Sequence, residues 1–156
     1  MKPYLVSVLS VFLMSGCTQH YISPTSGPIS KIRFVNHSDS KLQISYFDES
    51  TKCVGRRATE TILPKAQSEH IVGAEREITF QYYLSDQKRG TEQYCLTNLR
   101  FHPNSNRIYL FQTVQASKIC GWSMSDVTVD GSPVLVPLTN AGWTRGFSDA
   151  SSWCRQ

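Results

Sequence analysis

The sequence predicts an all-β protein: an antiparallel, immunoglobulin-like β-sandwich that holds two disulfides. Three observations support this fold class. Polar and apolar residues alternate with period two in several short segments, as half-buried strands require. Clusters of turn-forming residues separate these segments at short intervals. No segment sustains a helical period, and the closest one, residues 65–75, is interrupted by Gly73.

The predicted strands follow one another along most of the chain. They are residues 31–35, 42–47, 60–63, 68–72, 78–84, 93–101, 107–114 and 118–129. The first two flank a polar turn, and we expect them to form a hairpin. A further strand at residues 134–138 would be confined to a sheet edge by Pro133 and Pro137, because proline cannot donate to a strand ladder.

The amino-terminal residues have the composition of an export signal. Lys2 is followed by a mostly apolar, uncharged run at residues 4–14, whereas a membrane-spanning helix needs roughly 20 apolar residues. The run ends in Leu13-Met14-Ser15-Gly16-Cys17, which resembles the lipobox of bacterial lipoproteins. Met14 departs from that pattern, which prefers Leu at this place. An ordinary secretory signal followed by a chance cysteine is the alternative.

The resemblance implies cleavage after Gly16 and lipidation of Cys17, by diacylglycerol on the thiol and by a fatty acid such as palmitate on the new amino group. It also implies an outer-membrane location facing the periplasm, because Gram-negative lipoproteins held in the inner membrane tend to carry Asp where this chain has Thr18. The predicted domains are therefore a signal peptide at residues 1–16, a lipidated cysteine with a flexible tether at residues 17–30, and a single β-sandwich domain at residues 31–156.

The predicted tether is rich in Pro, Ser, Thr and Gly and offers little to bury. A flexible segment of this length has an end-to-end distance of roughly 20 Å, so the domain would stand off the membrane. In the alternative arrangement, Tyr21 and Ile22 dock on the domain.

Four cysteines follow Cys17, and an even number in an exported chain implies two disulfides with three possible connectivities. The chain is expected to reverse twice between Cys95 and Cys120, so both would lie at the same end of the sandwich. A bridge between them is plausible if their strands lie on facing sheets or beside a bend. By elimination, Cys53 then pairs with Cys154.

The segment from Cys95 through Cys120 and the following strand to Val127 also resembles part of a group of small exported bacterial β-domains of unknown function. The shared features are the first cysteine, the turn Phe101-His102-Pro103, Tyr109 in the next strand, and the second cysteine. The resemblance covers only this part of the chain, and it implies no activity.

Catalytic and metal motifs are weak in this sequence. Gly121-Trp122-Ser123-Met124-Ser125 approaches a hydrolase nucleophile elbow, but it lacks the final glycine and lies in a predicted strand. Several carboxylates occur in loops, where we interpret them as solvated charge: Asp48, Glu49, Glu75 and Glu77. The histidines are scattered and the cysteines form no close pair, so we predict no metal and no cofactor.

The carboxyl-terminal tail is the better candidate for recognition. Trp143, Phe147 and Trp153 occur there without strand alternation, so they either cap an open end of the sandwich or form an exposed patch. Arg56 and Arg57 follow Cys53 and would lie beside the tail if Cys53 is bridged to Cys154. An arginine pair near aromatic rings could bind anionic cell-wall or lipopolysaccharide groups, whereas a solvated loop is the alternative.

These observations predict a non-enzymatic, lipid-anchored module of the cell envelope that serves in binding, as an adaptor or as a structural part. Its partners would be the membrane, through the lipid on Cys17, and another envelope protein or a cell-wall component. Nucleic acid is not expected, because the mature chain carries 15 basic against 12 acidic residues, spread along its length. The alternatives are a membrane-peg subunit of an envelope-spanning secretion machine and a periplasmic inhibitor of a foreign hydrolase.

Overall fold

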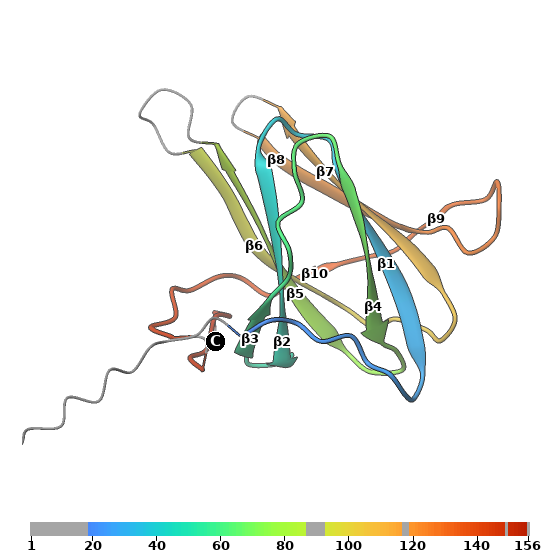
Figure 1. Cartoon of the computed structure of the whole chain (residues 1–156), viewed down its shortest axis with the longest axis horizontal. Helices are drawn as coiled ribbons and strands as arrows, with labels where there is room; N and C mark the ends of the chain where they lie inside the picture. The colour runs from blue at the N-terminus through green and yellow to red at the C-terminus, as the bar shows by residue number, and fades with distance from the viewer. Residues whose placement is uncertain (1–18, 87–92, 117–118, 149, 156) are drawn as a thin grey trace, which may run out of the picture.

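The computed structural model describes residues 19–86, 93–116, 119–148 and 150–155. The predicted signal peptide and Cys17 lie outside the described residues. In the described part of the chain, strands form two five-stranded sheets that pack face to face, and no helix is present (Figure 1). The predicted all-β sandwich with two disulfides is confirmed.

The first sheet has the strand order β4-β1-β7-β8-β9. Its strands are β1 (Ile29–Asn36), β4 (Gln67–Gly73), β7 (Ile108–Ala116), β8 (Ile119–Asp126) and β9 (Val134–Leu135). Neighbouring strands run antiparallel except β1 and β7, which are parallel, with Ile32 opposite Tyr109. β9 lies at the edge of the sheet, as the flanking prolines predicted.

The second sheet has the order β10-β6-β5-β2-β3 and is antiparallel throughout its described pairs. Its strands are β2 (Lys41–Glu49), β3 (Val54–Ala58), β5 (Ile78–Asp86), β6 (Gln93–Phe101) and β10 (Thr139–Asn140). The predicted strand at residues 60–63 is reduced to an isolated bridge between Leu42 and Ile62. β3 and β10 were not predicted, because neither has an alternating pattern.

The predicted hairpin of residues 31–35 and 42–47 is wrong. β1 lies in one sheet and β2 in the other, so the polar segment between them crosses from sheet to sheet. The buried side chain of Asn36 holds this crossing. Its Nδ2 donates to the carbonyls of Ser40, Ile62 and Leu63 at 2.8, 3.3 and 3.1 Å, and its Oδ1 accepts from the Ser38 hydroxyl at 2.6 Å.

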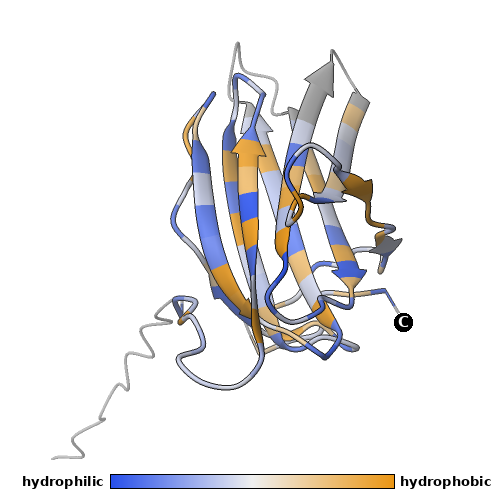
Figure 2. Ribbon diagram, turned by 90° about the vertical axis from the view of Figure 1, so that its right-hand side faces the viewer, coloured by the Kyte–Doolittle hydropathy of each residue, from blue (hydrophilic) through white to orange (hydrophobic). Residues whose placement is uncertain are grey.

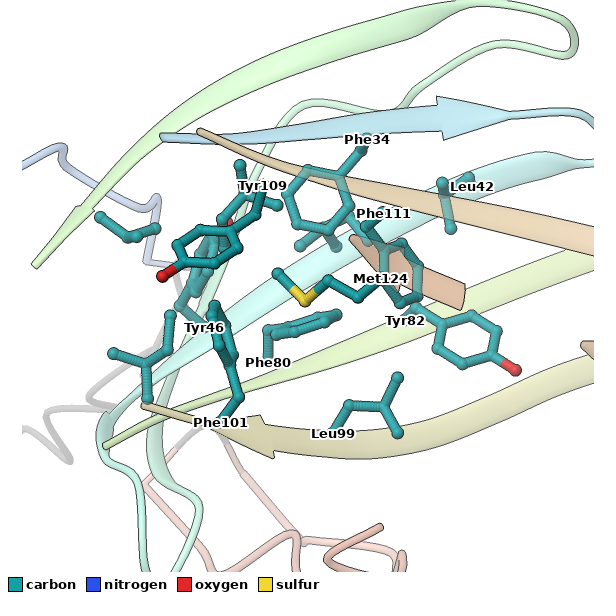
Figure 3. Close-up of a cluster of buried hydrophobic side chains, with 14 of the residues drawn as sticks. Phe34, Leu42, Tyr46, Phe80, Tyr82, Leu99, Phe101, Tyr109, Phe111 and Met124 are labelled. Carbon is teal, nitrogen blue, oxygen red and sulfur yellow. The ribbon is translucent and has the colours of Figure 1, made fainter. Parts of the chain in front are cut away.

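The core lies between the sheets, and its residues come from the apolar positions of the alternating strands. Figure 2 shows hydrophobic and hydrophilic residues alternating along the strands, and Figure 3 shows the aromatic side chains that meet in the interior. The rings of Phe34, Phe80 and Phe111 are all fully buried, with centroids 5.2–5.6 Å apart. Aromatic packing of this kind joins β1, β5 and β7 across the sandwich.

The two disulfides have different places in the fold. Cys95 and Cys120, with Cα atoms 5.7 Å apart, join β6 to β8 and therefore link the two sheets. Cys53 and Cys154, with Cα atoms 5.3 Å apart, join the turn between β2 and β3 to the carboxyl-terminal tail. Both pairings agree with the prediction.

Candidate functional site

The carboxyl-terminal tail is held on the outer face of the second sheet, not over an open end of the sandwich. After β10, the amide of Ala141 donates to the carbonyl of Asn98 at 2.9 Å. The Nδ2 of Asn98, a residue with no exposed surface, donates to the carbonyls of Gly142 and Trp153 at 2.9 and 2.6 Å. A side chain in the middle of β6 thus binds both ends of the tail.

A small second core lies beneath the tail. It contains the buried residues Phe47, Cys53 and Cys154, with Ala141 and Trp153 packed against them. The apolar side chain of Phe47 points to the outside of the sheet, where a sandwich strand would otherwise meet solvent. The tail and its disulfide therefore supply the apolar cover that this position needs.

The aromatic residues of the tail have three different environments. Trp153 is half-buried, and its Nε1 donates to the carbonyl of Ser148 at 3.0 Å. Trp143 is also half-buried, and its indole nitrogen has no hydrogen-bond partner among the described residues. Phe147 is fully exposed, at 104% of its reference surface. The tail therefore does not cap an open end of the sandwich. Phe147 is exposed, as in the other alternative that the sequence offered, whereas Trp143 and Trp153 are half-buried.

Of the two arginines, the structure places one against the tail. The Cζ atom of Arg56 lies 4.4 Å from the ring centroid of Trp153, a cation–π contact. Arg57 turns to Asp48 instead, with its Nε and Nη2 each 2.7 Å from a carboxylate oxygen. Because this bidentate pair occupies its guanidinium, Arg57 is less suited to bind an external anion.

A second feature lies along the edge of β3, where the flexible tether predicted for residues 17–30 is wrong for residues 19–21 and the alternative, docking on the domain, holds for Tyr21. The chain at residues 19–21 pairs with the end of β3: the Ala58 amide donates to Gln19 at 3.0 Å, and the Tyr21 amide donates to Ala58 at 2.9 Å. The Tyr21 hydroxyl donates to the Ile71 carbonyl at 2.8 Å. Tyr21 therefore docks on the domain, while Ile22 is 80% exposed.

Tyr21 packs against buried polar groups that lie between the two sheets. Its ring centroid is 4.3 Å from that of Tyr46, and burial raises the pKa of Tyr21 to about 12. The Tyr46 hydroxyl lies 3.1 Å from Nδ1 of His70, and burial lowers the pKa of His70 to about 4. His70 is therefore a neutral imidazole near pH 7.

A cavity of about 400 Å³ opens beside these groups, between the docked segment and the edges of β3 and β4. It is lined by His20, Tyr21, Ser23, Ala58, Thr59, Glu60, Ser68, Glu69 and His70. Glu69 faces Lys31 at 2.9 Å and Arg33 at 3.4 Å, and these cations hold the pKa of its carboxyl below the ordinary value. The signal for this site in the sequence was the pair Tyr21 and Ile22 in a segment that is otherwise rich in Pro, Ser, Thr and Gly.

The structure also shows where the weaker catalytic and metal-site candidates from the sequence lie. Residues 121–125 lie within β8 and pair with β7, so the Gly-Trp-Ser-Met-Ser segment is extended and does not form an elbow. Of the carboxylates that the sequence assigned to loops, Asp48 and Glu49 instead lie at the end of β2. All four contact cations or backbone: Asp48 pairs with Arg57, Glu49 faces Lys52, Glu77 faces Arg100, and Glu75 accepts from the Ser105 amide. In the described ranges, no three His, Cys, Asp or Glu side chains gather in a way that could hold a metal ion.

Within the described residues, no helix has the length and apolarity to cross a membrane. Comparison of the chain with protein-family models, with curated proteins and with solved structures gave no match.

Proposed function

We propose that this protein is a lipid-anchored lipoprotein of the cell envelope, and that it acts as a non-catalytic binding or adaptor module. The anchor would be the lipid on Cys17, and by the lipobox resemblance the location is the outer membrane facing the periplasm. The recognition surface would be the stapled tail, with Phe147 and Trp153, together with Arg56 of β3, which contacts Trp153.

The observation that carries the proposal is the use of the five cysteines. The four that follow Cys17 form two disulfides, and Cys17 stands outside both bridges, directly after the small residues of the lipobox. Disulfides persist in oxidising compartments such as the periplasm. Export of the chain would account for the bridges, and lipidation would account for the remaining thiol.

The tail has the properties of a preorganised recognition surface. Its covalent bond to the β2–β3 turn and its hydrogen bonds to Asn98 fix the backbone before any partner arrives. The exposed ring of Phe147 offers apolar area, and the Arg56–Trp153 pair offers a cation beside an aromatic face. Surfaces of this type bind with little loss of conformational entropy.

Lipidation is tested by expressing the full chain with its signal in bacteria fed an alkyne analogue of palmitate. Wild type should incorporate the label, partition into the detergent phase and have the mass of the chain cleaved before Cys17 plus that of its acyl groups. Cys17→Ala should lose the label and the processing, whereas the neighbouring Thr18→Ala keeps both. Equal labelling of wild type and Cys17→Ala would reject the anchor.

Recognition is tested with a photo-crosslinking phenylalanine analogue at position 147 in intact cells, with the same analogue at Val129 as the matched exposed control. A discrete adduct at position 147 that is absent at position 129, and that weakens in Arg56→Gln, would support the tail as the binding surface. The same adducts at both positions, or none at position 147, would reject it.

A further inference from the structure

The docked segment at residues 19–21 also determines how the domain would sit on its membrane. We propose that the edge of the sandwich formed by β3, residues 19–23 and β4 lies directly against the lipid surface that holds Cys17. This inference rests on the lipid anchor proposed above, and it adds the orientation of the domain.

The chain is hydrogen-bonded to the folded domain from Gln19 onwards, only two residues after Cys17. Two backbone hydrogen bonds join Gln19 and Tyr21 to Ala58, and a third joins the Tyr21 hydroxyl to Ile71 in β4. The Tyr21 ring packs on Tyr46 and against the main core. Residues 19–21 therefore bridge the edge strands of both sheets and belong to the folded domain.

Covalent geometry then limits the distance to the lipid. Cys17 precedes Gln19 by two residues, and two residues of extended chain span at most about 7 Å. A free tether over residues 17–30 would instead have allowed roughly 20 Å. With its acyl chains in the hydrocarbon, Cys17 would lie at the headgroup level, and the neighbouring β3–β4 edge must lie there too.

The opposite side of the molecule must then face away from the membrane. β3 and β4 each end their sheet, and β9 is at the far end of the first sheet from β4. Figure 1 places the loop that leads to β9 far from the point where the chain enters the domain. The loop carries the exposed side chain of Val129, and β9 carries those of Val134 and Leu135.

The orientation is tested with the full lipidated protein in nanodiscs of phosphatidylethanolamine and phosphatidylglycerol, some of which carry a nitroxide on the headgroup. Amide signals are compared with and without reduction of the nitroxide. We expect the signals of Ala58 and Ser68, on the β3–β4 edge, to be lost to paramagnetic broadening, while that of Leu135 is retained. Equal broadening at these positions, or preferential broadening at Leu135, would overturn the inference.

Two variants test whether the short link between the lipid and the docked segment causes the broadening of the Ala58 signal. A flexible insert of about ten Gly and Ser residues between Thr18 and Gln19 leaves the docked segment intact but lengthens its link to the lipid to roughly 20 Å. It should restore the Ala58 signal. Ile22→Ala, which changes a neighbouring exposed side chain, should behave as wild type. An insert that left Ala58 fully broadened would also overturn the inference.

Failure of the anchor itself is distinguishable. A chain without lipid would not co-purify with nanodiscs at all, and this outcome would reject the proposed function before any orientation is measured. A chain that binds nanodiscs but broadens uniformly keeps the anchor and rejects only the orientation.

Discussion

Acidification should destabilise the domain through one buried imidazole. His70 in β4 is only 9% exposed, and its ring lies 4.9 Å from that of Phe34 and 5.8 Å from that of Tyr46. Its Nδ1 is 3.1 Å from the Tyr46 hydroxyl. Burial penalises the charged imidazolium, which lowers the pKa of His70 from 6.5 to about 4.

The sign and the size of the effect follow from linkage. Because the pKa is lower in the folded state, the unfolded chain takes up the proton first as the pH falls. The stability is therefore complete above the unfolded value of 6.5 and is lost as the pH falls from 6.5 to about 4. A difference of roughly 2.5 pKa units corresponds to about 3 kcal/mol in the free energy of unfolding.

Urea unfolding at pH 7 and at pH 4 measures this loss. Carboxylates also titrate in this range, so the loss is compared between wild type and His70→Gln, which cannot be protonated and keeps a partner for Tyr46. Wild type should lose about 3 kcal/mol more than His70→Gln, while the exposed substitution His102→Gln should match wild type. Equal losses in wild type and His70→Gln would refute the assignment.

Three further changes at neutral pH should have separate effects. Replacing Cys53 and Cys154 by Ser opens a loop with a sequence separation of 101 and should cost about 4–5 kcal/mol in urea unfolding, more than loss of the inter-sheet bridge, with its separation of 25. Asn36→Ala leaves buried turn groups unpaired and should cost about 3 kcal/mol, and a loss under about 1 kcal/mol would contradict this role. A β-carbon at Gly146 would lie 2.6 Å from the Trp153 indole, so Gly146→Ala should shift the Trp153 emission, and an unchanged spectrum would contradict that packing.

The parts of the fold that the sequence predicted depend on local pattern. Alternation predicted strands at residues 78–84 and 107–114, which are β5 and β7, and the structure buries Phe80, Tyr82 and Phe111 in them. The Cys95–Cys120 bridge followed from counting chain reversals, which holds because β6 and β8 run through facing sheets. Where side-chain period and chain direction decide the structure, the sequence is sufficient.

The parts that it missed depend on contacts between distant residues. β3 reads VGRRA, without alternation, and it is a strand because β2 offers it an edge to pair with. The crossing between β1 and β2 has the composition of a hairpin turn, and its direction is decided by Asn36 reaching Ile62 and Leu63. The Arg56–Trp153 contact likewise exists only because the tail returns to Cys53.

The docked segment gives a last prediction, because it also covers an edge. β3 ends the second sheet, and an exposed edge strand can pair with another chain. Gln19 and Tyr21 occupy the amide and the carbonyl of Ala58 on that side. A lipid-free chain that begins at Thr18 should therefore protect the Ala58 amide from hydrogen exchange and remain monomeric in sedimentation. One that begins at Ser23 should lose that protection and self-associate with increasing concentration. If both forms protected Ala58 equally, the pairing at residues 19–21 would not be what covers β3, and the short link between lipid and domain would lose its basis as well.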